Sequence, residues 1–234
     1  MSDRKIALVT GGNRGIGFEV VRQLLMRDFE VVLSCREIAD GEAALKQLDG
    51  LSKRVSVLGL DVADHSSVEK AAAEFGKLFH QLDVLVNNAG ILLDASENIM
   101  TVSEDMLTQT WNTNSVGPLR VVRAFFPYLE KSNDACVINV SSLAGQLKDM
   151  GSWAPAYCIS KTALNAVTCV LSNDLKQHGI QVNSVSPGWI RTEMGGPSAP
   201  GTVEEGTDTI VWLATEAPRS LTGQFLMDRG TTDW

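Results

Sequence analysis

A tyrosine and a lysine four residues apart, Tyr157 and Lys161, are the pair in this sequence with the clearest capacity for chemistry. On a helix, residues at this spacing lie on one face. A nearby ammonium favours phenolate over phenol, so we expect Lys161 to lower the pKa of Tyr157 from its usual value of about 10. Such a tyrosine could donate a proton near neutral pH. The spacing by itself is common, and an interior tyrosine beside an unrelated surface lysine would also produce it.

A glycine-rich turn, T-G-G-N-R-G-I-G at residues 10–17, follows the first predicted strand and leads into a predicted helix. Glycines allow a tight turn and close approach of the backbone to a phosphate, and free N–H groups at a helix start attract an anion. This context favours a pyrophosphate site over a simple turn. The expected contacts are Gly11, Asn13, Arg14, Gly15, Ile16 and Gly17.

The second predicted strand ends without the acidic residue that would bind the ribose hydroxyls of NAD. Instead Arg36 follows this strand, and Arg14 lies in the glycine-rich turn. Guanidinium groups are well shaped to bind a phosphate, so the pattern favours NADPH/NADP over NAD. A second interpretation is that Arg36 only ends a strand at the surface and pairs with Glu37 or Asp40.

Short apolar runs alternate with amphipathic segments along the chain. The runs predict strands at residues 5–10, 30–35, 54–60, 83–87, 135–141, 180–186 and 224–227. The segments between them predict helices at residues 16–27, 41–48, 66–78, 103–111, 115–129, 155–177 and 203–214. Buried strands joined by helical crossovers form a parallel sheet. We therefore expect an α/β fold: a Rossmann-type doubly wound parallel sheet of about seven strands, flanked by helices on both faces.

Nothing in the composition divides the chain, so we expect one domain over residues 1–234. Its cofactor half would cover roughly residues 1–113, and its catalytic and substrate half roughly 114–234. The irregular stretch at 188–206 is long for a loop and is a candidate lid.

The net charge of -8 opposes binding to nucleic acid or to an anionic membrane surface. No stretch approaches the roughly 18 apolar residues of a membrane span. The four cysteines lack C-x-x-C spacing, as is typical of reduced thiols, and they indicate neither a metal site nor a disulfide framework. We expect a soluble cytoplasmic protein.

The glycine-rich turn and six motifs that follow it in order resemble those of the short-chain dehydrogenase/reductase superfamily across essentially the whole chain. After the glycine-rich turn they are Asp61-Val62, the N-N-A-G motif at 87–90, Asn114, the serine pair 141–142, Tyr157 with Lys161, and P-G-W-I-R-T at 187–192. The resemblance implies oxidoreductase activity with a nicotinamide cofactor.

The resemblance also implies a role for each catalytic position. Tyr157 would donate a proton to a carbonyl oxygen as hydride arrives, and Ser142 would hydrogen-bond the same oxygen. Lys161 would hold the nicotinamide ribose and favour the tyrosinate, and Asn114 would complete a proton path. Ser142 is preferred to Ser141 as the second serine of the pair, and Asn114 is preferred to Asn112 because Gly117 follows it.

Further cofactor contacts are implied by the same motifs. They are Asp61, Val62, Asn88, Ala89, Gly90, Tyr157, Lys161, Pro187, Gly188, Ile190 and Thr192. Thr192 with the backbone of Ile190 would anchor the carboxamide.

Within the superfamily, the C-terminal third is most similar to NADPH-dependent carbonyl reductases, which reduce ketones and aldehydes. An apolar substrate pocket is expected at Leu143, Met150, Trp153, Trp189 and Met194, although ordinary packing would also explain each of them. The helices predicted at 115–129 and 155–177 would be free to form the family's four-helix interface, giving a homodimer or homotetramer.

Two alternatives stay open at this point. The chain could reduce 3-oxoacyl groups on acyl carrier protein, although Arg191 is the only cation near 188–206, against Glu193, Glu204 and Glu205. Alternatively, it could be an NADPH-binding sensor or scaffold without turnover.

Overall fold

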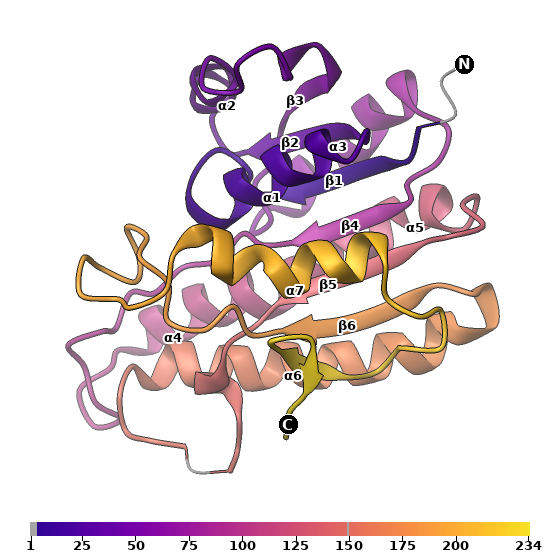
Figure 1. Ribbon diagram of the computed structural model, residues 1–234. Coiled ribbons are helices and arrows are strands. Elements are labelled where there is room, and N and C mark those ends of the chain that lie inside the picture. Colours follow the sequence, from indigo (N-terminus) through magenta and orange to yellow (C-terminus); the bar gives the residue numbers. More distant parts are fainter. Residues whose placement is uncertain (1–3, 149) are drawn as a thin grey trace.

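The computed structural model describes residues 4–148 and 150–234, and it shows one twisted sheet between two layers of helices (Figure 1). Strand order in the sheet is β3-β2-β1-β4-β5-β6-β7-β8, and every pairing is parallel except that of β7 with β8. The strands are β1 (Ile6–Thr10), β2 (Glu30–Cys35), β3 (Val55–Gly59), β4 (Val84–Asn87), β5 (Cys136–Val140), β6 (Gln181–Val185), β7 (Phe225–Met227) and β8 (Gly230–Thr231). This order confirms the predicted Rossmann-type doubly wound sheet.

Helices cover both faces of the sheet because the central strands are apolar on both sides. In β1, Ala7 and Val9 belong to one buried cluster with helices α1 and α7, whereas Leu8 belongs to the other cluster with α3, α5 and α6. This alternation follows from the two-residue period of a strand. The α-helices are α1 (Gly15–Met26), α2 (Ile38–Leu45), α3 (His65–Leu78), α4 (Glu104–Trp111), α5 (Gly117–Leu129), α6 (Pro155–Leu175) and α7 (Val203–Thr215).

Three details differ from the sequence-based expectations. The second helix spans Ile38–Leu45 instead of residues 41–48. A short antiparallel strand, β8, extends the sheet beyond the seven expected strands. The helices predicted at 103–111 and 115–129 are joined without a break, because a π-helical turn, η2 (Asn112–Val116), connects α4 to α5. Short 3-10 turns also occur at η1 (Ser52–Arg54), η3 (Leu143–Gly145) and η4 (Lys176–His178).

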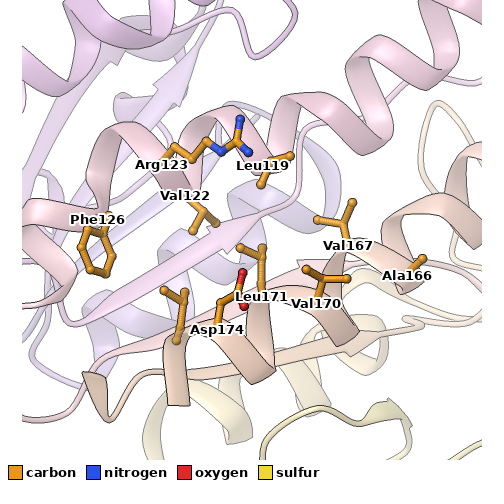
Figure 2. A pocket seen from close by; sticks show the side chains of 10 residues that line it. Leu119, Val122, Arg123, Phe126, Ala166, Val167, Val170, Leu171 and Asp174 are labelled. Carbon is orange, nitrogen blue, oxygen red and sulfur yellow. The ribbon is translucent and has the colours of Figure 1, made fainter. Parts of the chain in front are cut away.

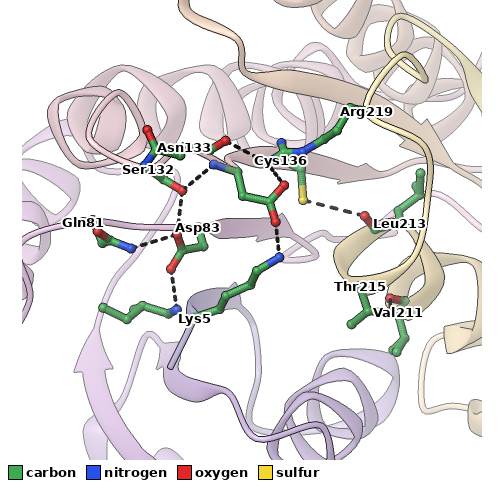
Figure 3. A network of polar contacts seen from close by, with 12 residues as sticks. Lys5, Gln81, Asp83, Ser132, Asn133, Cys136, Val211, Leu213, Thr215 and Arg219 are labelled. Atoms are coloured by element: carbon green, nitrogen blue, oxygen red, sulfur yellow. Dashed lines mark hydrogen bonds and ion pairs between the residues drawn. The ribbon is translucent and has the colours of Figure 1, made fainter. Parts of the chain in front are cut away.

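A polar network ties strands together at the amino end of the sheet (Figure 3). The buried Asp83, next to β4, accepts hydrogen bonds from the backbone N–H of Ile6 at 2.7 Å and from Ser132 at 2.5 Å. Asp134 pairs with both Lys5 and Arg219 beside it. The network links β1, β4 and the entry to β5, and it leaves the opposite edge of the sheet for the motif residues.

That opposite edge is formed by the carboxyl ends of the strands. Strands β1 and β4 are neighbours in the sheet. After β1 the chain runs to α1 on one face, and after β4 it runs toward α5 on the other face. In open α/β sheets this switch point is where ligands bind. In the part of the chain that the structure describes, no helix combines the length and apolar character needed to cross a membrane.

Candidate active site

The glycine-rich turn closes tightly between β1 and α1. Gly11 and Gly15 have φ of +63° and +54°, a backbone conformation that favours glycine. A Cβ atom on Gly17 would lie 2.3 Å from the carbonyl oxygen of Gly11 and 2.4 Å from Nδ2 of Asn88. Gly17 is therefore required for the close approach of α1 to the turn.

Asn88 holds this turn against the end of β4. Its side-chain amide donates to the carbonyl oxygens of Thr10 at 2.9 Å and Gly11 at 3.0 Å. In the other direction, Oγ1 of Thr10 accepts from the backbone N–H groups of Asn88 and Ala89, both at 3.0 Å. Thr10 was not among the expected cofactor contacts, although it is the first residue of the glycine motif.

The two arginines predicted to bind a phosphate differ in their surroundings. Arg14 is exposed and forms an ion pair with Glu193, with Nη1 2.5 Å from Oε2. This pair connects the glycine-rich turn to the 188–206 segment. Arg36 is exposed directly after β2, and within the described residues it pairs with neither Glu37 nor Asp40. Its guanidinium is therefore available to an anionic ligand.

The remaining cofactor motifs border the same edge of the sheet. Asp61, two residues after β3, accepts a hydrogen bond from the N–H of Ala63 at 2.9 Å. Val62 is buried against Gly117, where a Cβ would come within 3.0 Å of the valine side chain. Thr192 lies against Gly15, whose Cβ would be 3.4 Å from its methyl carbon.

The segment at 188–206 is folded on itself. Ile190 pairs with Gly201 in an isolated bridge, and the indole N–H of Trp189 donates to the carbonyl oxygen of Gly195 at 2.8 Å. Gly188, which follows Pro187, has a φ of +83°. Arg191 donates to the carbonyl oxygens of Ala199 and Pro200 within its own loop.

Lys161 is almost fully enclosed at the centre of the site. Its side chain is buried, and Nζ donates to the carbonyl oxygen of Val140, the last residue of β5, at 2.8 Å. Burial disfavours the ammonium and lowers the pKa of Lys161 to about 8. The nitrogen lies 5.6 Å from the centre of the Tyr157 ring.

Tyr157, one helical turn before Lys161 on α6, is partly exposed. Burial of the rest of the side chain raises the pKa of its phenol, and a hydrogen bond with Ser142 acts in the opposite direction. The expectation that the pKa of Tyr157 lies below its usual value is therefore wrong. The physical reason is that both groups are desolvated, and Lys161 directs Nζ to a backbone carbonyl.

The two adjacent serines have different partners. Ser141 is buried, and its hydroxyl donates to the side chain of Asn165 at 2.7 Å. Ser142 lies beside Tyr157, where it acts to lower the pKa of the phenol, and its hydroxyl accepts from the N–H of Ala144 at 3.1 Å. The structure thus brings Ser142, and not Ser141, to the tyrosine.

Asn114 lies in the π-helical turn and is buried. Its amide exchanges two hydrogen bonds with the backbone of Ile91, at 2.8 and 2.9 Å, and donates to Oγ of Ser160 at 3.0 Å. Ser160 in turn donates to the carbonyl oxygen of Tyr157 at 2.7 Å. Asn112 faces elsewhere, since its side chain bonds Ala63 and Arg120. Ser160 is a second residue that the sequence interpretation missed.

Gly90 lies between two of these groups. A Cβ at Gly90 would be 3.3 Å from Oδ1 of Asn114 and 3.6 Å from Nζ of Lys161. Gly90 therefore leaves space beside the lysine that a Cβ would narrow.

The five residues predicted to line a substrate pocket all keep exposed side chains, namely Leu143, Met150, Trp153, Trp189 and Met194. Trp153 contacts Tyr157 edge to face, with ring centroids 6.1 Å apart. The loop after Ser142 is held by the last residues of the chain, because Gln146 donates to the side chain of Thr232 and the carbonyl oxygen of Asp233. No cluster of possible metal ligands occurs among the described residues.

Comparisons with known proteins identify the class of protein to which this fold and site belong. A family model for short chain dehydrogenases matches residues 5–202. The chain therefore belongs to the short-chain dehydrogenase family and is an oxidoreductase.

Individual relatives within this family include carbonyl reductases that use NADPH. The chain is 30% identical to carbonyl reductase [NADPH] 1 of Oryctolagus cuniculus, covering 100% of this chain and 99% of that protein. It is 32% identical to (+)-neomenthol dehydrogenase of Arabidopsis thaliana, covering 90% and 91% of the two chains. Among solved structures, NADPH-bound carbonyl reductase from chicken fatty liver superposes with a TM-score of 0.91 at 30% identity, over 99% of this chain and 94% of that one.

Proposed function

We propose that this protein reduces ketone or aldehyde carbonyls to alcohols with NADPH as the hydride donor. The observation that carries the proposal is the contact of Ser142 with the Tyr157 hydroxyl, beside a buried Lys161, at the switch point of the sheet. The similarity to NADPH-dependent carbonyl reductases supports the same activity.

NADP(H) is the cofactor, and the residues present fit it. Gly11 and Gly15 hold the turn in a conformation that favours glycine, and Gly17 lets α1 approach it closely. Helix α1 presents its free N–H groups at this turn. Arg36 and Arg14 provide cations for the 2′-phosphate, with Arg14 exchanging Glu193 for that phosphate. Lys161 would bind the nicotinamide ribose.

When bound, NADPH supplies a hydride to the carbonyl carbon of the substrate. As the carbon–oxygen double bond becomes a single bond, negative charge accumulates on oxygen, and Ser142 stabilises it by a hydrogen bond. Tyr157 then transfers its phenolic proton to that oxygen, giving the alcohol. A raised pKa keeps this proton in place at neutral pH. Lys161 would return a proton to Tyr157, while Asn114 and Ser160 hold the backbone of the tyrosine in place through the Tyr157 carbonyl oxygen.

Two features favour a small-molecule substrate over an acyl carrier protein. Carrier proteins are acidic and bind clustered cations, but Arg191 is engaged with its own loop, and Arg14 would be occupied by Glu193 or by the cofactor phosphate. The exposed rings of Trp153 and Trp189 are suited to an apolar carbonyl compound.

The activity is tested by replacing the proton donor. Tyr157→Phe removes the phenolic proton and keeps the ring, so we expect carbonyl-dependent NADPH oxidation to fall by at least about 100-fold. The measurement is NADPH absorbance with a panel of aromatic and aliphatic ketones, with NADPH binding followed separately by fluorescence. Wild-type protein that binds NADPH and turns over no carbonyl compound would contradict the proposal.

We also propose that the protein is a homodimer or homotetramer. An apolar groove lies on the outer surface between α5 and α6, where Figure 2 shows aliphatic side chains of both helices facing one another. Its lining consists of Leu119, Val122, Arg123, Phe126, Ala166, Val167, Val170, Leu171, Asp174 and Leu175. A second copy of the chain, presenting the same two helices, would cover this surface.

A further inference from the structure

A buried carboxylate, Asp94, lies in the segment that follows the N-N-A-G motif. It is 0% exposed, and its Oδ2 atom accepts a hydrogen bond from the backbone N–H of Ala156 at 2.6 Å. Within the described chain, Asp94 forms no ion pair, and its Oδ1 atom has no hydrogen-bond partner. Burying such a charge is costly, so its single contact is of interest.

That contact is made at the start of α6, which has no cap of its own. Ala154, the residue before the helix, adopts the left-handed conformation with φ of +44° and provides no side-chain hydrogen bond. Pro155 has no N–H group. Ala156 therefore carries the first N–H of the helix, and Asp94 accepts from it at the positive end of the helix dipole. The next residue is Tyr157.

The other end of the same segment is fixed to Asn114. Ile91 exchanges two backbone hydrogen bonds with the Asn114 side chain, and Asn114 reaches the carbonyl oxygen of Tyr157 through Ser160. Residues 91–94 thus connect two points on either side of the tyrosine. Displacing either end would move Tyr157 relative to Ser142.

We propose that Asp94 is a positioning residue for the reaction: by holding the amide of Ala156, it fixes the start of α6 and sets the location of the Tyr157 hydroxyl. This inference rests on the proposed function of Tyr157 as proton donor. Asp94 acts through the backbone and does not touch the substrate. An error of 1 Å in placing a reacting group can cost about 100-fold in rate.

The test compares Asp94→Ala with Asp94→Asn, which keeps an oxygen acceptor for Ala156. The alanine variant should lower kcat by about 10- to 100-fold, while KM and the Kd for NADPH change by less than about threefold. The asparagine variant should recover most of kcat. Hydrogen exchange should accelerate at residues 155–158 in Asp94→Ala and remain unchanged in the rest of the molecule.

A control is Asp64→Ala, because Asp64 is the exposed N-cap residue of α3 and also accepts from a backbone N–H in the first turn, that of Ser66 at 2.9 Å. This variant should accelerate exchange at the start of α3 and leave kcat unchanged. If Asp94→Ala does not fold, Asp94→Ser and Asp94→Asn provide the same comparison with a shorter acceptor and a neutral one.

Two results would overturn the inference. The first is faster exchange at 155–158 with unchanged kcat, which would make Asp94 a helix cap only. The second is an equal loss of kcat in the alanine and asparagine variants, which would assign the effect to the charge. If the proposed function is wrong, the wild-type protein will reduce no carbonyl compound. The hydrogen-exchange measurement still tests whether Asp94 holds the start of α6, so the two failures can be told apart.

Discussion

The pairing of Tyr157 with Lys161 shows how far burial can change the chemistry expected of two side chains. An exposed ammonium one helical turn away would lower a phenol pKa. In this structure Lys161 is enclosed, its pKa falls to about 8, and the pKa of Tyr157 is raised. The tyrosine is therefore protonated at neutral pH, which is the state a proton donor needs.

The lowered pKa of Lys161 makes a prediction about stability. Because the unfolded chain holds its lysine proton up to about pH 10.4, it binds more protons than the folded protein above pH 8. Stability should therefore rise with pH in this window. Relative to Lys161→Met, which removes the titrating group, the free energy of unfolding of the wild type should increase by about 2 kcal/mol from pH 7 to 9.5.

The measurement is urea denaturation of both ligand-free proteins at several pH values. Taking the difference between the two cancels the titration of other groups. A difference that does not change with pH would mean that Lys161 is not desolvated as the structure indicates.

At the scale of elements, two local distortions place the functional groups. The π-helical turn between α4 and α5 carries Asn114 to Ile91 and Ser160, which the uninterrupted helix period would not do. The approach of α1 to the glycine-rich turn depends on Gly17, where a Cβ would overlap the carbonyl oxygen of Gly11.

Gly17→Ala should therefore separate α1 from the turn. We expect a loss of stability of about 1–3 kcal/mol from overpacking and NADPH binding weakened by at least tenfold. Gly151→Ala is a suitable control, because a Cβ at Gly151 meets no atom within 4 Å. Thermal unfolding and fluorescence titration with NADPH measure the two effects, and equal behaviour of the two variants would argue against the tight approach.

At the scale of the whole molecule, the two ends of the strands have different roles. Asp83 and its partners hold the strands at the amino edge, while the carboxyl edge carries the candidate site. The groove between α5 and α6 lies outside both, on the surface that we propose a second copy covers.

Val170 tests that assembly. It is 61% exposed on α6 and lines the groove, so Val170→Glu would bury an unpaired charge between two copies. We expect the dimer Kd to rise by at least about 100-fold. Leu78→Glu, at a 60% exposed position on α3, is the matched control. Light scattering after size-exclusion chromatography gives the mass, and a monomeric wild type at micromolar concentration would refute the assembly.

Much of the fold could be predicted from the sequence, because buried strands and amphipathic helices have distinct hydrophobic periods that act locally. The order of the motifs likewise determined which residues to examine, from the glycine-rich turn to Tyr157 and Lys161. The π-helical turn at Asn114 has no comparable signal, because its geometry depends on the contacts with Ile91 and Ser160.

Only the tertiary structure decided the electrostatic state of the site. The pKa values of Tyr157 and Lys161 depend on desolvation by segments distant in sequence, and this reversed the expected direction for the tyrosine. In the sequence, Asp94 has the features of an ordinary loop residue. Its neighbours give no sign that it accepts a hydrogen bond from the backbone N–H of Ala156, 62 residues away. The hydrophobic period of a strand or helix depends on neighbouring residues and can be recognised in the sequence. Burial and long-range hydrogen bonds exist only once the chain has folded.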